Sequence, residues 1–397
     1  MCVGAGSVGK GAEYPKVPKV GTSNRLLKAQ NSGYKQVENR RTLFGDVRFF
    51  IRENSKMVFT RRQIIVSAAA AVAVCSSPTV FAANKSVKIA VGGKALYYYL
   101  PISIAESLGY FKDEGLDVEI IDFQGGSRSL QAVVGGSADV VSGAFEHTLA
   151  MQARGQAMQA FVLQGRAPQC VFAVSKKTMP NFKSMADLKG KKIGVTAPGS
   201  SSHAIAIFIL RNAGIEPKDV SFIGVGASAA AVAAMRAGQI DAFVNLDPVI
   251  ATLEKDNVIQ IVADTRVVEE SDKIFGGPMV AGCLYAPTRY IKENPEIIQG
   301  LTNAVVRADR WLAKATAEDI VKAVPESYFL GNKEIYVTGF MKNRPALSKD
   351  GFIPEGAPAI SFKSLQIVND KLDNFKPDYK AVFTNQFVEA AHKKYPN

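Results

Sequence analysis

One pattern of apolar and polar positions occurs twice along this chain, about one hundred residues apart. The first copy, residues 118–145, reads VEIIDFQGGSRSLQAVVGGSADVVSGAF. The second copy, residues 220–247, reads VSFIGVGASAAAVAAMRAGQIDAFVNLD and places Asp241 where the first has Asp139. In both copies a strand pattern leads through a helical pattern into a short apolar strand. The repeat predicts two similar lobes, and a cleft between two lobes is a common site for a small ligand.

Strands alternate with helices over most of the chain. The pattern predicts strands at residues 87–91, 118–123, 138–143, 170–174, 192–196, 220–225, 242–246 and 280–286. It predicts helices at residues 101–108, 125–134, 148–153, 200–212, 228–237, 297–312 and 318–324. This alternation favours an α/β fold of two βαβαβ lobes with mainly parallel sheets. The proline-broken C-terminal helices are expected to pack on the outside of the first lobe.

The length of 397 residues exceeds what one hydrophobic core usually supports, so two lobes plus extensions are expected. We assign residues 87–168 and 279–397 to lobe I and residues 169–278 to lobe II. Two crossovers would then join the lobes and act as a hinge.

The positive charge of the chain is concentrated at its N-terminus. The formal net charge is +12, and residues 1–82 hold 13 Lys and Arg against 4 Asp and Glu. The rest of the chain holds 35 basic residues against 32 acidic ones. A nearly balanced folded part gives no reason to expect nucleic acid as a partner.

The N-terminal segment has the parts of an export signal. Residues 60–62 form a charged Thr-Arg-Arg start, and residues 64–74 form an apolar stretch too short to span a bilayer. Small residues at 80–82 predict cleavage after Ala82 or Ala83. The segment is compatible with export through either the Sec or the twin-arginine pathway. Residues 1–56 lack periodicity, so we expect an upstream extension before a true start at Met57, and a signal at 57–83.

Three segments in this order resemble a known family. Residues 99–119 read YLPISIAESLGYFKDEGLDVE, residues 186–195 read ADLKGKKIGV and residues 235–242 read MRAGQIDA. Together they resemble the nitrate/sulfonate/taurine-type solute-binding proteins of ABC importers. The resemblance covers residues 87–312. It implies a two-lobed type II periplasmic binding protein, a monomer that captures a solute by lobe closure and delivers it to membrane permease subunits.

The same resemblance leaves an enzyme as the alternative. Pyrimidine-precursor proteins of thiamine metabolism, binding proteins and synthases alike, share this fold. Such synthases work in the cytosol and carry a cysteine-rich iron site. An export signal and only two cysteines beyond it, Cys170 and Cys283, favour a protein that is not an enzyme. These two cysteines either pair as a disulfide, which export permits, or are buried thiols.

Ligands of open parallel sheets bind beyond the carboxyl ends of the strands, where helices begin. Residues 198–203, PGSSSH, offer close backbone approach, hydroxyl donors and the positive end of a helix. The serines there either contact an anionic ligand or only cap the helix. The candidate ligand-binding residues at all such positions are Lys94, Tyr97, Tyr98, Gly126, Ser127, Ser142, Phe145, Glu146, His147, Gly199, Ser200, Ser201, Ser202, His203, Asn245 and Asp247.

The residue types suggest the chemistry of the ligand. Lys94 and the helix start favour an anionic organic solute: a sulfonate, a nitrate-like ion, or an aromatic or other organic carboxylate. Tyrosines and Phe145 would wall the cleft and suit a larger planar molecule. Glu146 and Asp247 instead suit an amine or a ring N–H. No metal-ligand spacing occurs, and we expect no metal and no cofactor.

The export hypothesis predicts one mature N-terminus. A mass spectrum of the protein purified from its native cell envelope should show a chain that begins at Ala83 or Asn84. A mature chain that begins well before Ala82 would contradict export.

Overall fold

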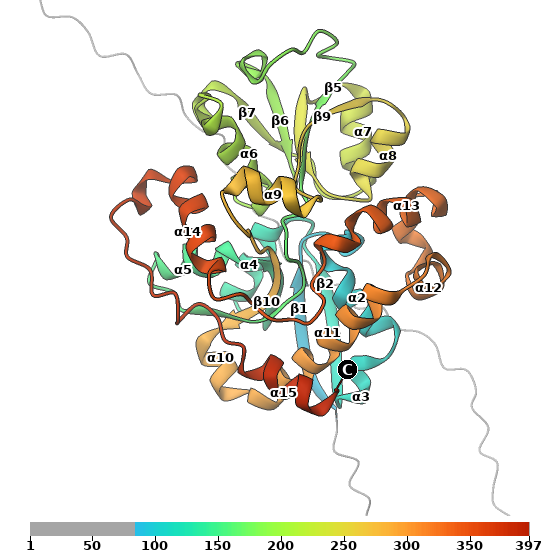
Figure 1. Ribbon diagram of the computed structural model, residues 1–397, viewed down its shortest axis with the longest axis vertical. Helices are drawn as coiled ribbons and strands as arrows, with labels where there is room; N and C mark the ends of the chain where they lie inside the picture. Colours follow the sequence, from blue (N-terminus) through green and yellow to red (C-terminus); the bar gives the residue numbers. More distant parts are fainter. Residues whose placement is uncertain (1–83, 397) are drawn as a thin grey trace, which may run out of the picture. The chain divides into compact units, whose positions relative to one another are not determined.

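The computed structural model describes residues 84–396, which form two lobes, each built on one five-stranded sheet (Figure 1). The predicted upstream extension and export signal lie outside these residues. The sheet of lobe I has the order β2-β1-β3-β10-β4 and contains β1 (Lys85–Val91), β2 (Leu116–Asp122), β3 (Val140–Ala144), β4 (Met158–Leu163) and β10 (Gly282–Pro287). The sheet of lobe II has the order β7-β6-β8-β5-β9 and contains β5 (Val171–Ser175), β6 (Lys192–Val195), β7 (Ser221–Gly224), β8 (Ala242–Asn245) and β9 (Ile259–Asp264).

Four strands of each sheet run in one direction, and the fifth runs against its two neighbours. In lobe I this strand is β10, which pairs antiparallel with β3 and β4; in lobe II it is β5, between β8 and β9. Each of these two strands enters its sheet from the other lobe, which explains the reversed direction. The predicted α/β two-lobed class is therefore confirmed. Strands β4 and β9 were not predicted from the sequence.

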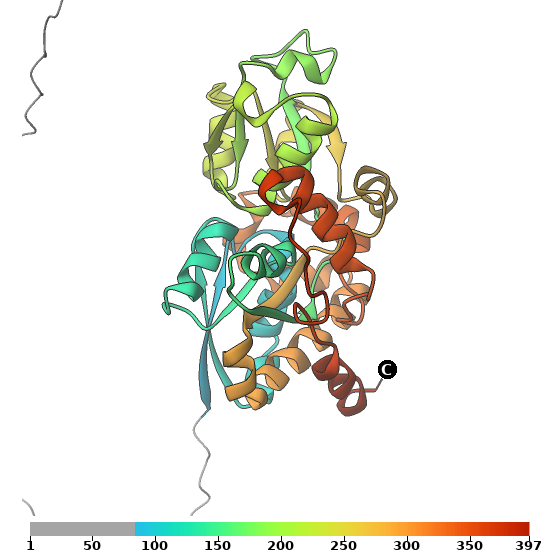
Figure 2. The same ribbon diagram turned by 90° about the vertical axis from the view of Figure 1, so that its left-hand side faces the viewer.

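The chain passes between the lobes twice, at residues 164–170 and again at residues 265–281. Figure 2 shows lobe II above lobe I, with the chain ending on lobe I. The helices that follow the strands of lobe I are α2 (Leu100–Ser107), α3 (Tyr110–Asp113), α4 (Gly126–Val134) and α5 (Glu146–Gln152). Those of lobe II are α6 (Ser201–Asn212), α7 (Ala229–Ala237), α8 (Val249–Lys255) and α9 (Val268–Phe275).

The two copies of the sequence repeat share one hydrogen-bonding device. The carboxylate of Asp139 accepts a hydrogen bond from the backbone N–H of Lys88 at 2.8 Å, which ties β3 to β1. Asp241 does the same for Lys192 at 2.9 Å, between β8 and β6. The paired glycines, Gly136 and Gly238, both have left-handed φ angles, 75° and 76°. The residues shared between the copies thus support the backbone of each lobe.

The C-terminal part is helical, as expected, but its helices also reach lobe II. They are α10 (Thr288–Glu293), α11 (Pro295–Lys314), α12 (Ala317–Ala323), α13 (Lys333–Asn343), α14 (Ala357–Val368) and α15 (Gln386–Lys394). Helix α13 packs on α8, and α14 packs on α6 as well as on α5 (Figure 1). Helices α11 and α15 pack on lobe I, as expected, whereas α13 and α14 also contact lobe II. None of the helices within 84–396 is long and apolar enough to cross a bilayer.

A fully buried guanidinium joins three of these parts. The side chain of Arg266, at the start of the second crossover, is bonded to Asp264 at 2.6 Å, Glu254 at 2.8 Å and Asp247 at 3.1 Å. Asn343 of α13 donates a hydrogen bond to the same Asp247 carboxylate. Strand β9, helix α8 and the C-terminal helix α13 therefore meet at one charge cluster.

The shared aspartates make the lobes' stability testable. Asp139→Ala and Asp241→Ala should each lower the free energy of unfolding by about 1.5 kcal/mol, because each removes a charge-assisted hydrogen bond to the backbone. Urea unfolding of both variants measures this. The exposed Asp117 on β2 gives a matched control, and Asp117→Ala should change stability by less than about 0.5 kcal/mol. Equal effects at all three positions would contradict the assigned role.

Candidate ligand-binding site between the lobes

A cavity of about 30 Å³ lies where the two lobes meet. Its wall follows the carboxyl ends of the strands, as parallel sheets predict. Lobe I contributes Gly92, Tyr98, Tyr99, Gly126, Ala144 and His147. Lobe II and the first crossover contribute Cys170, Thr196, Ser200, Ser201, Ser202 and Leu246. We call this space the inner cavity. It has room for about one or two water-sized groups, so it suits the polar head of a ligand.

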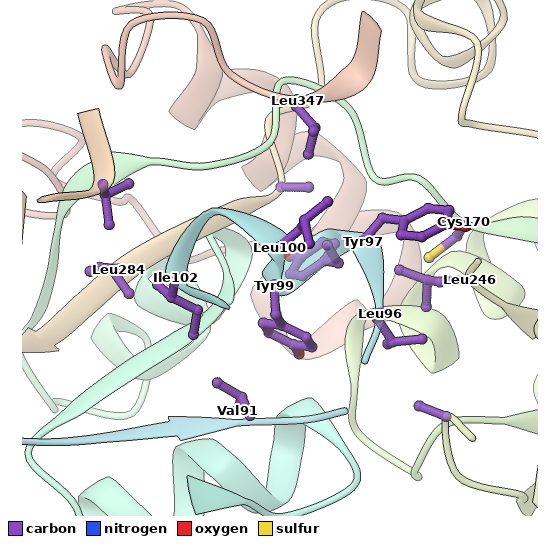
Figure 3. Close-up of a cluster of buried hydrophobic side chains, with 14 of the residues drawn as sticks. Val91, Leu96, Tyr97, Tyr99, Leu100, Ile102, Cys170, Leu246, Leu284 and Leu347 are labelled. Carbon is purple, nitrogen blue, oxygen red and sulfur yellow. The ribbon is translucent and has the colours of Figure 1, made fainter. Parts of the chain in front are cut away.

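The floor of the inner cavity is apolar. Figure 3 shows Leu96, Cys170 and Leu246 close together, and they come from lobe I, the first crossover and lobe II. Cys170 and Cys283 are both free thiols here, so the disulfide alternative does not hold in this structure. Burial raises the pKa of both thiols, which keeps them protonated and poorly reactive.

The start of α6 supplies hydrogen-bond donors. Ser200 precedes the helix, and the first N–H groups of a helix have no carbonyl partner within it. The Ser202 hydroxyl is already bonded to Thr196, at 3.0 Å from its N–H and 2.8 Å from its hydroxyl. Among the described residues the Ser201 hydroxyl makes no hydrogen bond. Ser201 and the helix start are therefore available to a ligand's acceptor atoms.

Two buried polar atoms in the wall lack partners among the described residues: the hydroxyl of Tyr98 and Nε2 of His147. Tyr98 is 5% exposed and His147 is 6% exposed. Burial, and after it the charge of Glu146, raises the pKa of Tyr98 well above its usual value. The Tyr98 hydroxyl therefore keeps its proton and is a donor. Leaving such groups unpaired costs about 1–3 kcal/mol each, which a ligand would recover.

A second tyrosine orients the imidazole of His147. The Tyr285 hydroxyl lies 2.9 Å from Nδ1 of His147, and within residues 84–396 it has no other partner. A buried hydroxyl has to donate its proton somewhere, so we assign Nδ1 as the acceptor. Nε2 then carries the proton and is a donor on a side chain that lines the cavity and lies near the backbone of Gly199 in lobe II.

Glu146 brings the opposite chemistry to the same place. It is 4% exposed, and its Oε2 atom is buried with no partner among the described residues. A buried carboxylate beside a cavity favours an N–H donor or a cation. The site thus offers donors from α6, Tyr98 and His147 on one side and an acceptor on the other.

A wider groove of about 590 Å³ continues outward from the inner cavity. His147, Ser200 and Ser201 line both spaces. We call the second space the outer groove. Its walls also include Glu146, Gly199 and His203, where the Gly199 N–H donates to Nδ1 of His203 at 3.0 Å.

The lobes touch directly beside the inner cavity. The Ser127 hydroxyl donates to the carbonyl of Pro198 at 2.9 Å, and the Ser127 N–H donates to the Ser200 hydroxyl at 3.1 Å. A Cβ on Gly125 would lie 2.6 Å from that of Ala197, closer than two carbons can pack. Ser127, predicted as a ligand contact, instead joins the lobes, and Gly126 beside it lines the cavity.

Besides Ser127, six further predicted contacts lie outside both spaces because other groups hold them. Three of these six are polar side chains of lobe I. Lys94 pairs with Glu106 at 2.8 Å, the Tyr97 hydroxyl donates to the carbonyl of Tyr336, and the Ser142 hydroxyl donates to Gln164 at 2.8 Å. These three side chains are corrected from ligand contacts to structural ones.

The other three are fully buried. Phe145 packs in the core of lobe I. Asn245 bonds to the carbonyl of Gly226 at 3.1 Å and to the N–H of Leu246. Asp247 is held by Arg266, so its carboxylate does not face the ligand. Of the two predicted carboxylates, only Glu146 remains beside the cavity.

Several wall residues were not predicted. Tyr99 neighbours the predicted contact Tyr98, and Thr196 is the last residue of a predicted strand, so the strand-end rule could have included them. The outer groove also takes Leu365, Val368 and Leu372 from the C-terminal segment and Arg154 from the end of α5. No local pattern places a C-terminal helix there. Within the described residues no group of three or more His, Cys, Asp or Glu side chains is arranged to hold a metal.

The chain matches known proteins along most of its described length. The family model for NMT1/THI5-like proteins matches residues 97–318, more than half of the chain. The protein therefore belongs to the NMT1/THI5-like family. A Bacillus subtilis protein named as a candidate binding protein, YtlA, is 25% identical over 69% of this chain and 80% of its own. The Saccharomyces cerevisiae 4-amino-5-hydroxymethyl-2-methylpyrimidine phosphate synthase THI13 is 23% identical over 73% of this chain and 84% of its own.

Solved structures show the same architecture. A protein from Bordetella bronchiseptica RB50 is 56% identical, with a TM-score of 0.78, over 79% of this chain and 98% of its own. The MOPS-bound alkanesulfonate-binding protein SsuA of Xanthomonas axonopodis pv. citri has a TM-score of 0.56 at 20% identity, over 77% of this chain and 97% of its own. The nitrate-binding protein NrtA of Synechocystis PCC 6803 has a TM-score of 0.61 at 16% identity, over 79% of this chain and 89% of its own. The fold is that of type II periplasmic binding proteins, which confirms the resemblance.

The buried histidines predict a pH dependence. Burial lowers the pKa of His147, against the charge of Glu146, and burial also lowers that of His203. Below about pH 6.5 the unfolded chain then binds more protons than the folded protein. The free energy of unfolding should therefore fall as the pH drops below about 6.5. His147→Gln should flatten this fall in chemical unfolding series at pH 5–8. An unchanged slope would show that this imidazole is not its source.

Proposed function

We propose that this protein is the solute-binding subunit of an ABC importer. It captures a small organic solute between its lobes outside the cytoplasm and delivers it to a membrane permease. The observation that carries this proposal is the pair of buried, unpartnered polar atoms, Tyr98 Oη and His147 Nε2, whose residues line the inner cavity together with the start of α6. Lobe I supplies the first two groups and lobe II supplies the third.

A ligand that bonds to both lobes stabilises the arrangement in which both contact it. Its differential affinity for that arrangement is what would drive closure, and closure is what a permease would recognise. The family membership and the predicted export signal at 57–83 support this role. The two bodies that close on the ligand would then be lobe I, residues 87–168 and 279–397, and lobe II, residues 169–278.

The site favours a solute with both acceptor and donor groups. The helix start, Ser201, Tyr98 and His147 suit the oxygens of a carboxylate or sulfonate. Glu146 disfavours a bare anion and favours an N–H or amine beside those oxygens. Nitrate lacks such a donor, so we expect an organic sulfonate or carboxylate that carries nitrogen, rather than nitrate.

A pyrimidine-precursor protein is the second candidate. The similarity to the yeast synthase favours it, and an aminopyrimidine would offer N–H donors to Glu146. We favour binding over synthesis because neither cysteine is an exposed, activated thiol, and no nucleophile lies beside a base in the inner cavity.

The ligand contact at Tyr98 can be separated from a structural effect. Thermal shift and calorimetry with amino-substituted and unsubstituted sulfonates and carboxylates, nitrate and pyrimidines should identify a ligand that stabilises the protein. Tyr98→Phe should then weaken it roughly 10- to 100-fold, the value of a hydrogen bond to a charged group. Since Tyr98 Oη has no protein partner, the melting temperature without ligand should hardly change.

The neighbouring Tyr97 is the matched control. Tyr97→Phe removes a hydrogen bond to the carbonyl of Tyr336 and should lower stability without changing ligand affinity. Equal affinity in Tyr98→Phe and the parent protein would contradict the site. Failure of every compound in the panel to bind would contradict the function.

A further inference from the structure

The outer groove is continuous with the proposed ligand site and is bounded by three helices. Its walls come from α5 of lobe I, α6 of lobe II and the C-terminal α14 with the short helix after it. Its volume of about 590 Å³ is far larger than the inner cavity and falls in the range of sites for organic ligands. The continuity at His147, Ser200 and Ser201 means that one molecule can occupy both spaces.

Three of the five C-terminal residues in the groove wall are apolar. Leu365, Val368 and Leu372 lie three and four residues apart and line the groove together. Ile207 of α6 adds a fourth apolar side chain. Such a surface favours the hydrocarbon part of a ligand over water.

Small residues keep the groove open. Ala150 on α5, Ala153 just after it and Ala204 on α6 line it where longer side chains would fill the space. All three are partly exposed, and Ala150 and Ala153 also pack against the core of lobe I. The space is therefore bounded by helix surfaces that a bound molecule can contact closely.

The charges along the groove are separated. Glu146 lies at the inner end, next to His147. Arg154 and Lys371 also line the groove and are exposed, and neither forms an ion pair with any described residue. Glu146 is the first residue of α5, and Arg154 lies two residues beyond its last, Gln152, so the two charges flank this helix. The inner end thus suits a donor and the rim suits an anion.

We propose that the outer groove is a second compartment of the ligand site, which selects an elongated organic molecule with three parts. A small polar head with amine and acceptor oxygens lies where the two spaces meet, with one polar group in the inner cavity and its amine beside Glu146. An apolar chain lies along Leu365, Val368 and Leu372, and an anionic end meets Arg154 and Lys371. This inference rests on the proposed function and adds the length and end group of the solute to it.

A series of probes with one head tests the groove. Linear 2-aminoalkanoates of three to eight carbons, and 2-amino dicarboxylates of the same lengths, are compared by calorimetry on the mature protein. Affinity should rise by about fourfold for each methylene that enters the groove. At the greatest length, the dicarboxylate should bind about two- to fivefold more tightly than the monocarboxylate, as expected for exposed ion pairs.

Filling the groove with a larger side chain should remove the affinity that longer probes gain over shorter ones. Ala204→Leu should leave the shortest probes unchanged and weaken the longest at least tenfold. Ala230 on α7 is exposed and remote from the groove, so Ala230→Leu is the matched control and should change neither. The double variant Arg154→Gln, Lys371→Gln should remove only the preference for dicarboxylates. The control double variant Arg128→Gln, Lys363→Gln should keep this preference, because both positions are exposed and neither lines the groove.

The outcomes separate this inference from the function it rests on. Affinity that is independent of length, or lost equally in Ala204→Leu and Ala230→Leu, overturns the second compartment. If no probe of the series binds while another compound still binds in a Tyr98-dependent way, the solute class is wrong and the importer function stands. If no compound of either panel binds, the function itself fails.

Discussion

The buried guanidinium of Arg266 is the interaction on which the arrangement of the site depends. It holds Asp247 in place, and the carbonyl of Asp247 accepts a hydrogen bond from the N–H of Tyr97 in lobe I. The residues next to these two, Leu246 and Tyr98, are walls of the inner cavity. Because a buried charge that loses its partner costs about 3–5 kcal/mol, this cluster resists rearrangement. The ligand site is thus built beside a rigid charge network and not within it.

Much of the fold could be predicted because its information is local. Period-two and helical patterns located most strands of both lobes. The residues that the two copies of the repeat share, Asp139 and Asp241, support the backbone, whereas the copies differ at the strand ends. Strand β9 was missed although Ile259, Ile261 and Val262 make it apolar and β-branched, so its local pattern could have located it. The contacts of α13 and α14 with lobe II were missed because they join segments far apart in the sequence.

The sequence predicted where the site lies, but only some of the residues that line it. Strand ends and the start of α6 did lead to Tyr98, His147, Ser200 and Ser201, all of which line a cavity. Position alone does not show which partner a side chain already has. Lys94 is taken by Glu106 and Asp247 by Arg266, and neither partner adjoins it in the sequence. Of the charged side chains predicted as ligand contacts, two carboxylates and a lysine, only the carboxylate of Glu146 therefore remains.

The direct contact between the lobes has a consequence for the kinetics of binding. At Gly125 and Ala197 the two backbones leave no space for even one further carbon, and the Ser127 hydrogen bonds close the same seam. A solute that is too large to enter through the outer groove reaches the inner cavity only while this seam is parted. The association rate is then set by how often the lobes separate, and the residence time by how long they stay together. Substitutions at the seam would change both rates without touching a single atom that recognises the solute.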